Sequence, residues 1–319
     1  MMLHIARLLA LGLSIVIATP APAQPLTGVL KRIKDSGEIT LGHRDASVPF
    51  SYLDDKQQPV GYSMDLCLRV VDHVKAELKL PALKVIYNPV TSANCIPLIA
   101  NGTIELECGS TVNNVERQAQ VAFSDTTFIV STRFIAKRDG NLKTLADLRG
   151  KTVVCTAGAN TLARVNGLNQ KQNLGMTILT GKDHAESLLM VDSGRAAAFF
   201  EDDILLTGLA ANSRDPASWS IGAEAYSIDP YALMLPRGDA AFKALVDRAL
   251  VEYFRGGAIM ATYDKWFAKP IPPRGVTLNF PLSAPLRKAF ATPDRFTRSG
   301  QLRMTTRPDC RSGVTIRAE

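Results

Sequence analysis

Residues 108–125, with the sequence CGSTVNNVERQAQVAFSD, combine three kinds of group that can contact an anion. Ser110 and Thr111 place hydroxyl groups in a turn, and Arg117 lies in the first turn of the helical segment that follows. The planar guanidinium of an arginine can hold a carboxylate through two parallel hydrogen bonds. Hydroxyls and free backbone N–H groups beside it would complete a cradle. These residue types at this spacing therefore predict a site for one small anion.

The segments that position this stretch alternate between strand and helix patterns. The first set of strands is predicted at 38–42, 83–90 and 103–108, with a helix carrying Leu66, Val70, Val74 and Leu78 and a short helix at 94–100. After an extended run at 128–136, strands at 151–155, 176–179 and 196–200 alternate with helices at 161–173, 185–191 and 203–210. A strand at 231–235 and helices at 239–253 and 258–267 return the chain. The chain would therefore form two α/β lobes and pass between them twice, which makes a hinge and a cleft.

Further motifs lie on both sides of residues 108–125. In chain order they are GHRDASVPFSY at 42–52, GYS at 61–63, GST at 109–111, ER at 116–117, FSD at 123–125, KDH at 182–184, AFFEDD at 198–203, KWF at 265–267 and PIPP at 270–273. This series resembles the amino-acid-binding proteins of ABC uptake systems, and among them the periplasmic glutamate/aspartate-binding proteins of solute-binding protein family 3. The resemblance covers roughly residues 28–290.

The resemblance implies an α/β, two-lobed periplasmic-binding-protein fold of type II. Two α/β sheets would be joined by a two-strand hinge, with the ligand cleft between them. We expect a signal peptide at 1–23, a discontinuous first lobe at 24–130 plus 231–294, a second lobe at 131–230, and a basic, disordered tail at 295–319.

The resemblance also implies how a free amino acid would be held. Arg117, with Ser110, would bind the α-carboxylate, and Asp202 in the other lobe would accept hydrogen bonds from the α-ammonium. A ligand that joins the two lobes in this way would close the hinge. We assign Asp203, the neighbour of Asp202, the simpler role of helix N-cap. Without the resemblance, Arg117 would be read as a solvated neighbour of Glu116.

The ligand side chain would meet a second group of residues. By resemblance Arg44 and His184 would face its distal carboxylate, and Ser92 and Thr156 offer hydroxyl contacts. Phe50, Tyr52 and Cys95 are candidates for the pocket wall, although Phe50 and Tyr52 fit a hydrophobic core nearly as well.

Three positions depart from the acidic-ligand pattern. Cys95 stands where those proteins carry an arginine, Val112 replaces a threonine, and Ala159 lacks a hydroxyl. A missing charge-assisted hydrogen bond costs about 1.5–3 kcal/mol. Either an acidic ligand binds more weakly, or the preferred ligand is glutamine, asparagine or a larger dicarboxylate.

The five cysteines, Cys67, Cys95, Cys108, Cys155 and Cys310, include no CxxC pair and predict no metal site. One or two disulfides are compatible with an oxidising compartment, and their pairing does not follow from the sequence. For Cys67 we favour a buried free thiol. For Cys95 we weigh a reactive thiol, or a disulfide with Cys108, against a small space-filling side chain, and favour the latter.

The N-terminal segment predicts the compartment, and the distribution of charge argues against nucleic acid as a partner. Arg7, the apolar run 8–18 and the small residues at 21–23 are typical of a secretory signal, so we expect a soluble periplasmic protein. The net charge is +7, but the signal holds one arginine, and residues 295–319 hold six arginines and two acids. The body therefore carries only +2, which does not favour nucleic-acid binding.

We conclude that the chain is a solute-binding protein that delivers a glutamate- or aspartate-like amino acid to an ABC permease of the inner membrane. We expect a monomer that has no catalytic residue, cofactor or metal. The alternative from another class is an enzyme on the same scaffold, similar to cyclohexadienyl dehydratases, in which His184 or Glu201 would act as acid or base. A third alternative is the sensing part of a receptor.

Overall fold

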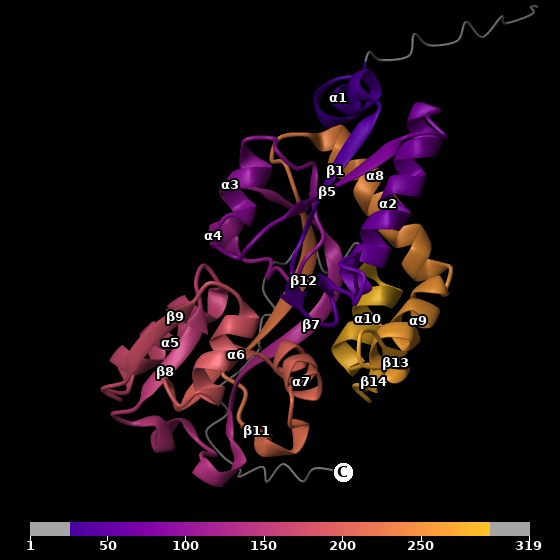
Figure 1. The fold of residues 1–319 in the computed structure, drawn as a ribbon. Coiled ribbons are helices and arrows are strands. Elements are labelled where there is room, and N and C mark those ends of the chain that lie inside the picture. The colour runs from indigo at the N-terminus through magenta and orange to yellow at the C-terminus, as the bar shows by residue number, and fades with distance from the viewer. Residues whose placement is uncertain (1–25, 294–319) are drawn as a thin grey trace, which may run out of the picture.

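The computed structural model describes residues 26–293 and arranges them as two α/β lobes, one above the other in Figure 1. The expected signal peptide at 1–23, the expected tail at 295–319 and Cys310 lie outside these residues. In the described part no helix is long and apolar enough to pass through a membrane.

Lobe 1 contains both ends of the described chain. Its helices are α1 (Gly28–Ser36), α2 (Tyr62–Leu78), α3 (Cys95–Ala100), α4 (Val115–Gln118), α8 (Ala240–Arg255), α9 (Ala258–Tyr263) with the π-helical turn η4 (Asp264–Ala268), and α10 (Ala284–Ala291). Its strands are β1 (Glu38–His43), β2 (Ala46–Ser47), β3 (Ser51–Leu53), β4 (Pro59–Val60), β5 (Lys84–Pro89), β6 (Leu106–Glu107), β13 (Pro270–Ile271) and β14 (Val276–Thr277).

Lobe 2 is the smaller, middle part of the chain. Its helices are α5 (Asn160–Lys171), α6 (His184–Asp192) and α7 (Asp203–Ala211), with the short 3-10 turns η1 (Arg138–Gly140), η2 (Leu145–Leu148) and η3 (Pro216–Ser218). Its strands are β8 (Thr152–Thr156), β9 (Thr177–Gly181), β10 (Ala198–Asp202) and β11 (Trp219–Ile221).

Two long strands, β7 (Ala122–Lys137) and β12 (Ser227–Leu235), pass between the lobes and form the hinge (Figure 1). They pair antiparallel, from Ser227 opposite Thr132 to Leu235 opposite Ala122, with irregularities on either side of Ala232. Because both lobes add strands to this pair, the sheet order is continuous, β5-β1-β6-β12-β7-β10-β8-β9, with β11 also on β7. The predicted lobe boundaries at 130/131 and 230/231 fall inside these two strands and remain predictions.

The helices form where the sequence pattern and end signals agree. In α2 the four-residue repeat of Leu66, Val70, Val74 and Leu78 is buried throughout. The helix α1 ends at Gly37, whose φ of 69° lets its N–H bond to the Ile33 carbonyl. Asp239 caps α8 by accepting from the Phe242 N–H, as predicted. The predicted strand at 103–108 is shorter than expected, because only Leu106–Glu107 pairs with the sheet.

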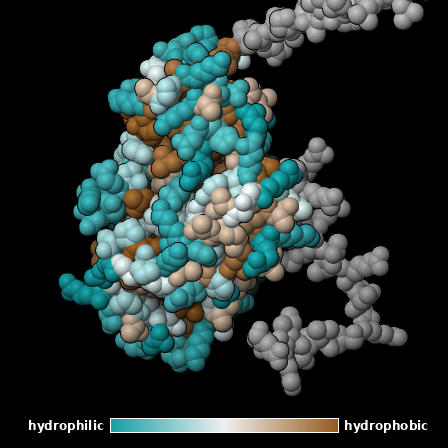
Figure 2. Space-filling view, turned by 90° about the vertical axis from the view of Figure 1, so that its right-hand side faces the viewer, coloured by the Kyte–Doolittle hydropathy of each residue, from teal (hydrophilic) through white to brown (hydrophobic). Residues whose placement is uncertain are grey.

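The largest hydrophobic cluster lies in lobe 1 and is joined by Ile204 and Leu205 of α7, while lobe 2 also has clusters of its own. In lobe 1, Phe50 contacts Tyr62, Phe128, Tyr231 and Phe267, with ring centroids 5.0–6.0 Å apart. Lobe 2 packs side chains on the two faces of its sheet, as separate clusters around Phe200 and Phe199. On the face shown in Figure 2, hydrophilic side chains predominate and hydrophobic ones are interspersed among them.

The cysteine predictions need one correction. Cys67, expected as a free thiol, forms a disulfide with Cys108, with 6.0 Å between the Cα atoms. Cys67 faces the sheet from α2, and Cys108 directly follows β6, so helix packing brings them together across 41 residues. Cys95 therefore cannot pair with Cys108; Cys95 and Cys155 are free and buried.

Candidate functional site

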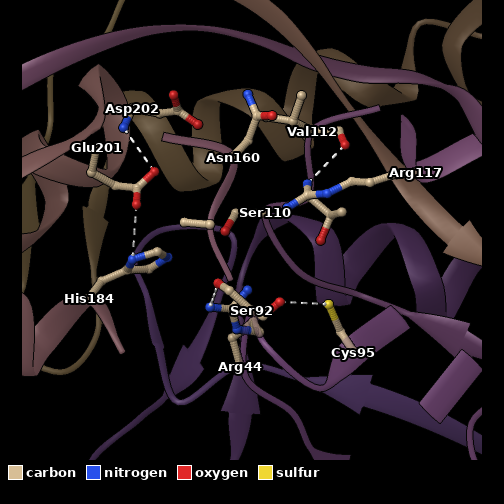
Figure 3. Close-up of a pocket in the computed structure, with 12 residues that line it drawn as sticks. Arg44, Ser92, Cys95, Ser110, Val112, Arg117, Asn160, His184, Glu201 and Asp202 are labelled. Carbon is tan, nitrogen blue, oxygen red and sulfur yellow. Dashed lines mark hydrogen bonds and ion pairs between the residues drawn. The ribbon is translucent and has the colours of Figure 1, made fainter. Parts of the chain in front are cut away.

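A cavity of about 20 Å³ lies between the lobes, with groups from both lobes around it (Figure 3). Its lining residues are Arg44, Ser92, Cys95, Ser110, Thr111, Val112 and Arg117 from lobe 1, and Ala159, Asn160, His184, Glu201 and Asp202 from lobe 2. A volume of this size holds about one water molecule. The lobes are therefore closed on one another, and a larger ligand must separate them to enter.

The predicted anion-binding turn forms one wall of the cavity. Ser110 Oγ is buried and has no hydrogen-bond partner among the described residues, so it is available to a ligand. Arg117 lies on the short helix α4, where its backbone N–H donates to the Asn114 side chain. The guanidinium donates to the Val112 carbonyl at 3.0 Å and to the Gly158 carbonyl of lobe 2 at 3.2 Å. Arg117 thus already joins the lobes through acceptors that a carboxylate could replace.

Arg44 follows strand β1 and is 4% exposed. Its backbone N–H donates to Ser51 Oγ at 2.8 Å, and its guanidinium donates to Ser92 Oγ at 2.7 Å. The buried carboxyl group of Glu107, on the neighbouring strand β6, offsets part of the Arg44 charge. Burial raises the pKa of Glu107, and Arg44 opposes that shift. Cys95 lies beside Ser92 and adds a small neutral side chain.

His184 and Glu201 form the lobe 2 wall, and each is 2% exposed. His184 opens α6, and its Nδ1 lies 3.3 Å from Glu201 Oε2 and 2.8 Å from Thr156 Oγ1. Burial lowers the pKa of His184, with a further contribution from Arg44. Burial raises the pKa of Glu201, as does the adjacent Asp202. The pair is therefore most stable without net charge.

Asp202 ends strand β10 and occupies the N-cap position of α7. Its Oδ2 accepts from the Tyr231 hydroxyl at 2.5 Å, and its Oδ1 accepts from Thr132 Oγ1 at 3.2 Å. Burial raises the pKa of Asp202 to about 7, and the Tyr231 hydrogen bond opposes this shift. Asp203 is not the N-cap that we predicted; its carboxylate instead accepts from the Ser131 and Ile204 N–H groups.

Six of the seven predicted ligand-binding residues line this cavity: Arg44, Ser92, Ser110, Arg117, His184 and Asp202. Thr156 is buried behind His184 and reaches the site through the imidazole. Cys95 lines the cavity, but Phe50 and Tyr52 do not. Phe50 lies in the aromatic core, and Tyr52 packs on Trp266 and donates to the Pro272 carbonyl. Phe50 and Tyr52 therefore have the role in the hydrophobic core that we gave as the alternative to the pocket wall.

The sequence interpretation did not assign a binding role to three polar side chains at the site. Glu107 belongs to the predicted strand 103–108, where a fully buried acid was not expected. For Glu201 the sequence suggests a role only in the enzyme alternative. Asn160 begins α5, and its Oδ1 accepts from Asn114 Nδ2 of lobe 1 at 2.9 Å. The sequence did offer a signal for Glu201: it follows two phenylalanines, Phe199 and Phe200, and precedes two aspartates, so an acid stands at the end of an apolar strand.

The closed arrangement also depends on close backbone approach. Gly158 of lobe 2, with φ of 74°, lies so near Ala93 that a Cβ atom would be 2.5 Å from the Ala93 Cα. Gly208 of α7 approaches Val48 of lobe 1, whose carbonyl oxygen would be 2.5 Å from a Cβ there. Glycine at these two positions therefore permits the contact between lobes.

Metal binding finds no support in the described part of the chain. Residues 26–293 contain no group of three or more His, Cys, Asp or Glu side chains able to hold a metal ion. The cavity instead offers two guanidinium groups, one imidazole and two carboxyl groups, which suit hydrogen bonding to a zwitterion.

Comparisons with known proteins agree with this fold. The L-glutamate/L-aspartate-binding protein of Pseudomonas aeruginosa is 50% identical, covering 87% of this chain and 92% of its own. The glutamate/aspartate import solute-binding protein of Escherichia coli is 44% identical, covering 90% and 95%. An ancestral arginine-binding protein bound to arginine shares the fold, with a TM-score of 0.66, 24% identity and coverage of 72% and 98%. Residues 39–269 match the bacterial extracellular solute-binding proteins, family 3, and the chain belongs to that family.

Proposed function

We propose that this protein is the solute-binding component of an ABC importer and binds glutamate, aspartate or a closely related polar amino acid by hinge closure. The observation that carries the proposal is the division of charge in one cavity. Arg44 and Arg117 enter from lobe 1, and Asp202 enters from lobe 2. The names of the relatives at 50% and 44% identity, which are binding proteins, also favour binding over the dehydratase-like alternative.

The charge arrangement indicates a role for each group. Arg117 would exchange its carbonyl acceptors for the α-carboxylate, with Ser110 Oγ as a second donor. Asp202, held by donors on both hinge strands, would accept from the α-ammonium. Arg44, Ser92 and His184 would surround the ligand side chain. Since each charge is matched as water leaves, closing the cleft need not bury an unpaired ion.

The proposal includes a location and a partner. Residues 1–23 would direct export, and the Cys67–Cys108 disulfide supports an oxidising compartment such as the periplasm. The closed protein would act as a monomer and present its ligand to a permease of the inner membrane. N-terminal sequencing of the exported protein and light scattering would test these points.

Calorimetric titration tests the function directly. Mature, ligand-stripped protein would be titrated with glutamate, aspartate, glutamine, asparagine and succinate in one buffer at pH 7. We expect an amino acid of this set to bind, with Arg117→Ala abolishing binding and the exposed control Arg195→Ala leaving it unchanged. Tightest binding of an amide would assign the specificity to Cys95, Val112 and Ala159. No binding by any amino acid would overturn the proposal.

A further inference from the structure

The Glu201–His184 pair carries information about the ligand side chain beyond the family assignment. Figure 3 shows Glu201 directed at one nitrogen of the His184 ring, while the other nitrogen faces the middle of the cavity. The Glu201 carboxyl is enclosed: Oε1 accepts from the Asp202 N–H at 3.1 Å, and Oε2 lies 3.4 Å from Thr161 Oγ1. The inward nitrogen, Nε2, is the one that can contact a ligand.

The number of hydrogens on the pair decides what Nε2 presents. With two hydrogens, either Glu201 is protonated and donates to Nδ1, or the imidazolium donates to a carboxylate; in both forms Nε2 carries a hydrogen. With one hydrogen, a bond between Nδ1–H and the carboxylate is preferred, and Nε2 becomes an acceptor. Thr156 Oγ1 can donate to or accept from Nδ1, so it is compatible with either state.

Charge acts in the same direction as hydrogen bonding. An ionised Glu201 next to a ligand carboxylate would add a repulsive charge to a closed, water-poor cleft. The other ionisable groups facing the pair are Arg44 from the loop after β1, Asp202 on β10, Cys155 on β8 and Tyr231 on β12. Asp202 accepts from the Tyr231 and Thr132 hydroxyls at 2.5 and 3.2 Å, whereas the donors to Glu201 lie at 3.1 and 3.4 Å, so Asp202 is the better of the two adjacent acids to carry the negative charge.

We propose that Glu201 and His184 act as one proton-holding pair that selects a ligand side chain ending in a carboxylate, and that cleft closure on such a ligand takes up one proton. This proposal rests on the proposed function, because it requires an amino acid in the cleft. In the open, hydrated cleft the pair loses its second hydrogen near the ordinary histidine range. Burial on closure raises the pKa of Glu201 and favours the doubly hydrogenated state that a carboxylate needs.

The test compares glutamate with glutamine between pH 6 and pH 8.5. The two ligands share the α-carboxylate and α-ammonium, so titration of Asp202, which is assigned to the ammonium, affects both alike. At pH 8, titrations in buffers of different ionisation enthalpy should show more proton uptake with glutamate than with glutamine, by up to one proton. Burial on closure acts with both ligands, whereas the side-chain carboxylate acts only with glutamate. The Kd for glutamate should rise relative to that for glutamine by up to tenfold per pH unit above the titration of the open pair.

A variant isolates the carboxyl group. The amide of Glu201→Gln can donate to Nδ1 at every pH, so the pH profile for glutamate should lose its extra slope and run parallel to that for glutamine, with only the titration of Asp202 left in both. Glu105→Gln is the control. Glu105 is an acid of lobe 1 that accepts from the Thr40 N–H and lies outside the cavity, and burial raises its pKa as it raises the pKa of Glu201. Its pH profile should match the wild type.

Each result decides one of the two proposals. Equal proton uptake with glutamate and glutamine, or an unchanged pH slope in Glu201→Gln, overturns the role of the pair while leaving amino-acid binding intact. Should Glu201→Gln fail to fold, the wild-type comparison still decides. Should glutamine not bind, the variant supplies the reference slope. Should neither ligand bind, aspartate and asparagine are compared in the same way, and absence of binding by all four overturns the proposed function and the inference that rests on it.

Discussion

Tyr231 donates its phenolic hydrogen to Asp202 Oδ2 at 2.5 Å, across the junction between hinge strand β12 and the end of β10. The other hinge strand, β7, supplies Thr132 to Oδ1. Both oxygens of the acid assigned to the α-ammonium are therefore held by the hinge itself. Movement of the hinge and orientation of this carboxylate are consequently coupled.

Tyr231→Phe should weaken ligand binding roughly tenfold at pH 7, since it removes one hydrogen bond to a charged group. The phenyl ring keeps the packing against Phe50, so the fold should persist. Without this donor the pKa of Asp202 rises further above about 7, and fewer molecules carry the charge that binds an ammonium. The ratio of variant to wild-type Kd should therefore shrink as the pH rises to 8.5. Tyr226→Phe, on the partly exposed Tyr226 outside the cavity, is the matched control, and an equal loss there would contradict the prediction.

Gly158→Ala should block closure and reduce affinity by at least about tenfold. The added methyl would lie 2.5 Å from the Ala93 Cα, a contact made only when the lobes meet. Alanine at a positive φ costs about 1 kcal/mol of stability by itself. Gly175→Ala is the control, because Gly175 also has a positive φ, 64°, but no atom lies within 4 Å of a Cβ there. This variant therefore has the backbone cost without the clash. X-ray scattering should show ligand-induced compaction for wild type and Gly175→Ala, whereas compaction of Gly158→Ala would refute this account.

Loss of the Cys67–Cys108 disulfide should lower the free energy of unfolding by about 2–4 kcal/mol, because it releases a 41-residue connection in the unfolded chain. Denaturant unfolding of Cys67→Ala/Cys108→Ala would measure the change. Reducing agent should destabilise the wild type but leave this double variant unaffected, although Cys95 and Cys155 remain in it. Alkylation of Cys67 and Cys108 in unreduced, denatured protein would show that the disulfide is absent.

Much of the site could be predicted from the family resemblance, because its short motifs lie at strand ends and helix starts. Arg44 follows β1, Asp202 ends β10 and His184 opens α6, so the topology brings them to one cavity. Residues whose surroundings come from distant elements were less predictable. Phe50 lies in the same motif as Arg44, yet aromatic side chains of β7, β12 and η4 pack around it and place it in the hydrophobic core.

The features that sequence reasoning did not predict depend on long-range packing. Pairing of Cys67 with Cys108 requires the position of α2 on the sheet, which no spacing along the chain defines. Glu107 looks like an ordinary strand residue until the guanidinium of Arg44 is placed beside it. Helix α10 was not predicted, although Leu286 and Phe290 bury one face of it against lobe 1.

Cys95 should be unreactive in the folded protein, which separates the space-filling interpretation from the reactive-thiol hypothesis. It is 2% exposed, and burial raises its pKa to about 11, with Arg44 and Arg117 opposing only part of that shift. At pH 8 the thiolate, which is the reacting form, is then about a thousandth of the population. Titration with a disulfide reagent, followed by peptide mass analysis, should find Cys95 unlabelled in native protein and labelled after denaturation. Rapid native labelling of Cys95 would instead restore the reactive thiol, and a ligand that slows such labelling would place it in the binding cleft.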